Sequence, residues 1–166
     1  QRLKEPSTDF RPIFHESHLA IQVNGHPPYR MNDWSFTQLC GLAGVAKDTV
    51  NRLWPGTAAQ VLTETLEDRR DKETDLQALV FDETIVRAIN GEKYKRLWNA
   101  DLVAMLLEFA TDFTPPQKGF NGATGLYAGE QDLFCFLIDP TGWTEIGGEA
   151  FAPGFFVWNS EVGRRS

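Results

Sequence analysis

The chain has 166 residues, of which 42% are hydrophobic and 23% charged, a composition typical of folded domains and not of disordered chains. An apolar run such as Leu102 to Leu107 is far shorter than the roughly 20 residues of a membrane-spanning helix. No secretion signal opens the sequence, and Cys40 and Cys135 lack the paired spacing of zinc or redox motifs. We therefore expect a cytoplasmic protein without membrane contact, with both cysteines reduced in its core.

The net charge of −7 is unevenly distributed along the sequence. Residues 1–56 carry a net charge of +1, whereas residues 57–118 and residues 119–166 each carry −4. Phosphates would be repelled by such a chain unless its basic side chains gathered on one surface. The charge therefore favours either a local basic site for nucleic acid or an acidic surface for a basic protein partner.

We predict a single domain over residues 1–166, and we expect it to be a piece of a longer protein. The sequence starts at Gln1 without a methionine and stops at Ser166 just after an apolar stretch. Within the domain, residues 1–75 should form an extended arm followed by a helical part. Residues 76–166 should form an antiparallel sheet with one helix.

A helix-turn-helix-like element is the sharpest local pattern. Ser35 is predicted to cap a first helix that Gly44 ends, and a second helix is predicted from Lys47 to Trp54. Ala43, Gly44 and Val45 supply the small residue, the turn glycine and the apolar plug that such a unit needs, so residues 37–53 resemble phage-type repressors. The second helix would then turn Lys47, Asp48, Thr49, Asn51 and Arg52 outward, where Lys47, Asn51 and Arg52 could meet DNA. An ordinary helical hairpin inside a larger fold is the alternative.

Further elements follow from periodicity and turn residues. A third helix over 57–70 should begin with a capping box made by Thr57 and Gln60. Strands over 76–81 and 84–89 should pair antiparallel, and Asn99 should cap a helix that ends before Thr114 and covers the sheet. The remaining strands are expected as a three-stranded meander, over 126–138, 143–146 and 151–158.

Metal and catalytic chemistry find little support. His15 and His18 lie three residues apart with His26 nearby, but Pro12 argues against a helix there, so surface histidines are the preferred interpretation. No triad, phosphate-binding loop or dinucleotide motif is present, and we predict no catalytic residue, metal or cofactor. A metal-dependent nuclease would need convergence of the acidic groups, which we expect instead to face solvent on strands: Glu130, Asp132, Glu145, Glu149 and Glu161.

Basic and aromatic residues alternate in one part of the chain, a pattern typical of single-stranded nucleic-acid sites, where bases stack on rings and cations follow phosphates. The tryptophans Trp98, Trp143 and Trp158 are expected in the core. The predicted nucleic-acid-binding residues outside the helix-turn-helix-like element are Arg87, Lys93, Tyr94, Lys95, Arg96, Arg164 and Arg165. The alternative is a hairpin end with ordinary solvated charges.

Two stretches carry a longer resemblance: 124–134, which reads TGLYAGEQDLF, and 154–163, which reads GFFVWNSEVG. Together with Gly147-Gly148-Glu149 and the region from Arg87 to Asp101, they resemble a phage- and plasmid-type family of laterally transferred proteins of unknown function. The resemblance covers roughly residues 30–163. It implies a mobile-element context, in which DNA maintenance, recombination, transfer and defence evasion are the usual roles.

The sequence thus predicts an α+β fold, with an N-terminal helical subdomain and an antiparallel sheet of hairpins covered by a helix. Our first hypothesis is a non-catalytic mobile-element protein that binds nucleic acid, preferentially single-stranded DNA, with an oligomer possible. The first alternative is an acidic interaction module that mimics DNA or binds a host protein. The second is the metal-dependent nuclease.

Overall fold

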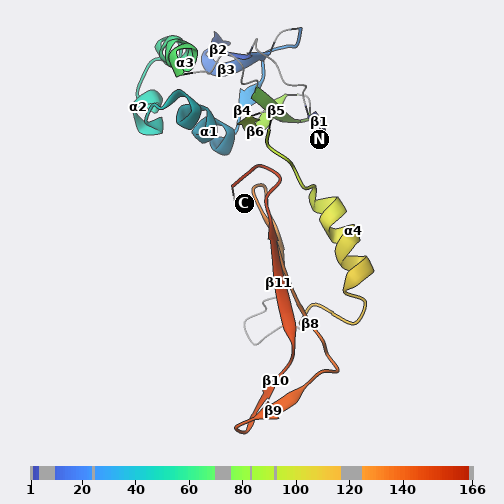
Figure 1. Cartoon of the computed structure of the whole chain (residues 1–166). Coiled ribbons are helices and arrows are strands. Elements are labelled where there is room, and N and C mark those ends of the chain that lie inside the picture. Colours follow the sequence, from blue (N-terminus) through green and yellow to red (C-terminus); the bar gives the residue numbers. More distant parts are fainter. Residues whose placement is uncertain are drawn as a thin grey trace. The chain divides into compact units, whose positions relative to one another are not determined.

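The fold is α+β and divides into two compact units, Gln1–Tyr94 and Lys95–Ser166, in the computed structural model (Figure 1). The structure describes residues 2–3, 10–23, 25–69, 76–82, 84–91, 93–116 and 125–164. We describe each unit by itself.

The first unit begins with paired strands and continues into three helices. Its elements are β1 (Arg2–Leu3), β2 (Phe10–His15), β3 (His18–Val23), β4 (Arg30–Met31), α1 (Asp33–Ala43), α2 (Lys47–Asn51), α3 (Pro55–Arg69), β5 (Leu76–Phe81) and β6 (Ile85–Gly91). The predicted pair of strands over 76–81 and 84–89 is confirmed as the antiparallel β5–β6 hairpin. It belongs to a sheet of order β1-β5-β6-β4, in which β4 runs parallel to β6.

Helix α1 ends as predicted but begins differently. Gly44 adopts a left-handed conformation with φ of 66°, which lets its amide satisfy carbonyls of the last turn. The side chain of Asn32, and not that of Ser35, caps the start by accepting from the Ser35 amide at 2.8 Å. The hydroxyl of Ser35 is fully buried and donates to the Val86 carbonyl at 2.7 Å, because α1 packs against β6.

The other helices also depart from their predicted boundaries. Helix α2 stops at Asn51, three residues before Trp54. Helix α3 starts at Pro55, so Thr57 lies inside it and forms no capping box, while Gln60 donates instead to Glu64. The core of this unit joins α1, α3 and the sheet through fully buried residues such as Leu39, Leu62 and Val86.

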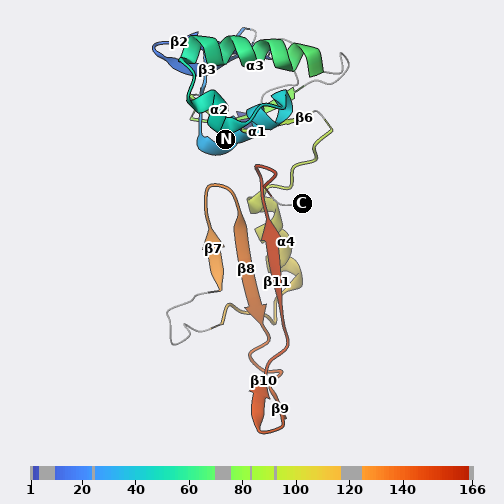
Figure 2. The same cartoon turned by 90° about the vertical axis from the view of Figure 1, so that its left-hand side faces the viewer.

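The second unit combines one described helix with two small sheets. Its elements are α4 (Asn99–Phe109), β7 (Leu126–Ala128), β8 (Leu133–Ile138), β9 (Thr144–Ile146), β10 (Glu149–Phe151) and β11 (Gly154–Asn159). Strand β8 lies between β7 and β11, with α4 over one face of this sheet (Figure 2). The predicted three-stranded meander is therefore wrong, because in the described part of the chain β9 and β10 pair with each other while β8 pairs across them with β11.

A turn after β11 ties the end of the sheet to the start of α4. The backbone amide of Asn99 donates to the Glu161 carboxylate at 2.7 Å. The cap of α4 therefore comes from a residue 62 positions away and not from the Asn99 side chain. That side chain accepts from the Asn159 amide group at 2.7 Å. Arg96 donates to the Glu161 carbonyl, and Ser160 donates to the Gln131 carbonyl at 2.6 Å. We call Asn159, Ser160 and Glu161 the polar turn.

No helix in the described part of the chain is both long and apolar enough to cross a membrane. Both cysteines are buried and unbridged, as the sequence predicts.

The capping role of Glu161 makes a stability prediction. Replacing Glu161 with Ala leaves the first turn of α4 without its acceptor and should cost about 1–2 kcal/mol in the free energy of unfolding, measured by urea titration with circular dichroism. Glu161→Gln retains an acceptor oxygen and should lose less. The exposed Glu145→Ala is the matched control, expected within about 0.5 kcal/mol of the wild type. Equal effects of Glu161→Ala and Glu145→Ala would contradict the capping role.

Candidate functional site

The pairing of β8 with β11 gives the sheet of the second unit two different faces. Directly paired residues share a face, and successive residues of a strand alternate between faces. Leu133, Cys135 and Leu137 of β8 face α4, and Leu106 and Ala110 of that helix pack against this group. The opposite face receives the aromatic residues that alternate with them.

We call this opposite surface the aromatic face. Phe134 pairs with Trp158 and also with Tyr127, and Phe136 pairs with Phe156. Of the residues described in these three strands, those on this face are all uncharged. The aromatic face thus consists of Tyr127, Phe134, Phe136, Phe156 and Trp158.

Three rings of the aromatic face lie close together, and three of its five residues are largely open to solvent. The Trp158 ring centroid lies 5.0 Å from that of Phe156 and 5.3 Å from that of Phe134. Tyr127, Phe156 and Trp158 are 58%, 58% and 53% exposed. Rings of this size normally supply core burial, so a contiguous exposed group indicates an interaction surface.

The expectation that Trp143 and Trp158 are core residues is wrong, because both are more than half exposed. Hydrophobicity alone does not tell which sheet face a helix covers. The sequence does carry a signal for the aromatic face. Phe134 and Phe136, and likewise Phe156 and Trp158, lie two positions apart, the spacing of side chains on one face of a strand.

The polar turn that follows β11 contacts the Arg96 side chain and the Arg164 backbone. Arg96 is half-buried, donates to the Glu161 carbonyl and stands 5.5 Å from the Trp98 ring centroid. Lys95 and Arg164 are exposed, and the Arg164 backbone amide donates to the Ser160 hydroxyl at 2.9 Å. The polar turn therefore binds the Arg96 side chain through the Glu161 carbonyl and the Arg164 backbone through the Ser160 hydroxyl, close to the end of β11.

The predicted run of basic and aromatic residues crosses the boundary between the units. Lys93 and Tyr94 belong to the first unit, whereas Lys95 and Arg96 belong to the second. Arg87 is half-buried and is the extra residue of a β-bulge between β5 and β6. Arg165 lies outside the described residues.

The helix-turn-helix-like element presents only part of its predicted DNA-contacting set. Asn51 and Arg52 are exposed at the end of α2. Lys47 instead forms an ion pair with Asp33 and donates to the Thr37 hydroxyl at 3.0 Å. With five residues, α2 is also shorter than a helix that lies along a DNA groove.

The acidic and histidine groups do not gather into a metal site. Across the described ranges, no three side chains of His, Cys, Asp or Glu come together as metal ligands would. His15 and His18 form a cross-strand pair at the end of the β2–β3 hairpin. Glu130 and Asp132 lie in the turn between β7 and β8, not on a strand as predicted, and Glu161 is buried as the cap of α4.

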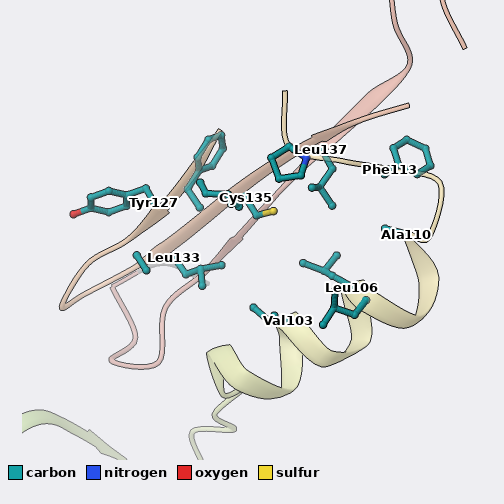
Figure 3. Close-up of a pocket in the computed structure, with 13 residues that line it drawn as sticks. Val103, Leu106, Ala110, Phe113, Tyr127, Leu133, Cys135 and Leu137 are labelled. Atoms are coloured by element: carbon teal, nitrogen blue, oxygen red, sulfur yellow. The ribbon is translucent and has the colours of Figure 1, made fainter. Parts of the chain in front are cut away.

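An apolar groove of about 440 Å³ runs between α4 and the strands β7 and β8 (Figure 3). Val103 and Leu106 line it from the helix, and Leu133 and Leu137 line it from β8. The Tyr127 hydroxyl points away from the groove, so the Cys135 thiol is the ionisable group that its lining offers. Such a lining suits apolar contact and provides no pair of groups for acid–base catalysis.

No match to this chain was found among models of known protein families, among curated proteins or among solved structures. The resemblance to the phage- and plasmid-type family therefore remains a prediction.

Burial of the two thiols predicts how fast they react with a disulfide reagent. Burial raises the pKa of Cys135, and it also raises that of Cys40, where the Lys47 ammonium offsets part of the effect. The folded chain should react slowly with a disulfide reagent at neutral pH, because the thiolate is the nucleophile. Reaction should accelerate as the pH rises past a thiol's ordinary pKa.

Folding and pH are linked through the same groups. The folded chain holds these thiol protons more tightly than the unfolded chain, so this contribution to stability is present below the unfolded thiol's pKa and lost above it. Stopped-flow labelling with mass spectrometry would follow each cysteine, with the urea-unfolded chain as control. Equal labelling rates for folded and unfolded chain at neutral pH would contradict the assignment.

Proposed function

We propose that the chain binds single-stranded DNA, without catalysis, through the aromatic face of its second unit. The observation that carries this proposal is the exposure of Phe156 and Trp158 on β11, with the exposed Tyr127 on β7 beyond the central strand, on an uncharged sheet face. Bases stack on such rings whatever their identity, because every base has a π-face.

The geometry favours single strands over duplex DNA. In a duplex, base faces are stacked on one another and only their edges line the grooves. A sheet that offers exposed aromatic rings and no charged side chains can bind unstacked bases but has no group to bond to the edges of paired ones. Arg164 and Lys95 would contact phosphates at the Trp158 end of the site.

Charge limits the proposed affinity. Residues 95–166 carry five basic and nine acidic side chains, a net charge of −4. Binding would therefore depend on stacking more than on phosphate contacts, with a modest salt slope of about 0.7 for each phosphate neutralised on a single strand. The resemblance described above would place this activity in a mobile genetic element, in DNA maintenance or recombination.

The acidic charge of residues 95–166 favours a second candidate function, that of a protein-interaction module. Negative charge steers a chain toward basic partners and away from phosphates. In that case the aromatic face would be a protein interface, and oligonucleotides would not compete for it.

Trp158 makes the binding prediction specific. Replacing Trp158 with Ala should weaken binding of a labelled oligo-dT strand by about 1–3 kcal/mol, roughly 5- to 150-fold in Kd, measured by fluorescence anisotropy. Trp143→Ala, an exposed tryptophan outside the aromatic face, is the matched control and should leave Kd unchanged. Arg164→Ala should lower the salt slope by about 0.7.

Two outcomes would contradict the nucleic-acid proposal. One is the absence of oligo-dT binding at low salt, which would leave the protein-interaction module. The other is equal weakening by Trp158→Ala and Trp143→Ala, which would mean that the aromatic face is not where the strand binds.

A further inference from the structure

The hairpin formed by β9 and β10 presents a second apolar surface, separate from the aromatic face. Every residue from 143 to 151 is exposed. Three of them are large and apolar: Trp143, Ile146 and Phe151 are 55%, 63% and 47% exposed. A two-stranded hairpin that buries so little gains almost no stability from its own apolar side chains.

The hairpin nevertheless has a regular turn and a hydrogen-bonded base. Gly147 and Gly148 both have positive φ, 65° and 87°, as a two-residue turn between antiparallel strands requires. At the base, the Asp139 amide donates to the Pro153 carbonyl at 2.9 Å. The Asp139 carboxylate accepts from the Thr141 backbone amide and hydroxyl, both at 2.8 Å, and these bonds lower its pKa.

The register places apolar and acidic groups side by side. Ile146 pairs with Glu149, and Phe151 pairs with Thr144, so all four share one face of the hairpin. Glu145 lies on the other face. From residue 139 to residue 153 the sequence contains three carboxylates and no lysine or arginine.

The negative charge of the hairpin determines which kind of partner surface can bind to it. DNA phosphates and anionic lipid headgroups would be repelled by Asp139, Glu145 and Glu149. A surface that covered Ile146 and Phe151 would also meet the Glu149 carboxylate on the same face, so its apolar patch would be flanked by lysine or arginine.

We propose that the β9–β10 hairpin docks onto a protein partner that presents an apolar stripe bordered by basic side chains. This interface is independent of the proposed DNA binding, since it uses none of the residues of the aromatic face. Because the turn and base of the hairpin are already formed, little conformational entropy would be lost on docking.

The test uses a defined probe with the full chain. The probe is a fluorescein-labelled amphipathic helical peptide of about 18 residues, with leucine on one face and lysine along its borders. Its control replaces every lysine with glutamate. The lysine peptide should bind saturably, with an affinity that falls as salt is raised, and the glutamate peptide should not bind.

Variants assign the binding to the hairpin. Ile146→Ser with Phe151→Ser should weaken peptide binding by roughly tenfold or more, because two apolar contacts are lost. Glu145→Gln with Glu149→Gln should weaken it less and flatten its salt dependence. Phe156→Ser with Trp158→Ser, on the aromatic face, should leave peptide binding unchanged. All of these positions are exposed, and circular dichroism checks that each variant folds.

Three results would overturn the proposal: no binding of the lysine peptide, equal binding of the glutamate peptide, or binding that the hairpin variants leave intact. Saturable binding of phosphatidylcholine vesicles in place of the peptide would assign the hairpin to a membrane surface and would overturn it as well. Loss of oligo-dT binding has no bearing on any of these results, so the two proposals fail separately.

Discussion

The pairing of β8 with β11 is the constraint on which the second unit depends. It joins residues 133–138 to residues 154–159 in one register, and that register sorts the side chains between two faces. A slip of one residue in β11 would press Phe156 and Trp158 against α4 and turn Phe155 and Val157 to solvent. The apolar core under α4 and the aromatic face opposite it therefore arise from the same set of backbone hydrogen bonds.

The polar turn extends this constraint to the start of α4 and to the basic groups. Glu161 caps the helix, and Asn159 and Ser160 bind backbone and side-chain groups from two other segments. The backbone of Arg164 is fixed by Ser160 beside the strand that bears Trp158. The helix start, the strand end, the Arg96 side chain and the Arg164 backbone thus share a single hydrogen-bonded turn, so a change in any of them would disturb the proposed binding surface.

What the sequence predicted well depends on local rules. Gly44 ends α1 because a left-handed residue is needed there, and the β5–β6 hairpin follows from two short apolar runs. What it missed depends on distant partners. The cap of α4 comes from Glu161, 62 residues away, so no local sequence pattern near Asn99 predicts it. The prediction of a core position for Trp158 fails because alternation separates the two faces of a strand but does not tell which face a helix covers.

The central claim is that the exposed aromatic face receives the bases of a single strand. Oxidative footprinting with mass spectrometry, with and without oligo-dT, reads each aromatic residue separately. The account predicts that Trp158 and Tyr127 are oxidised in the free chain and protected by oligo-dT but not by duplex DNA, while Trp143 is oxidised throughout. Protection of Trp158 in the free chain, or its unchanged oxidation when oligo-dT is bound, would contradict it.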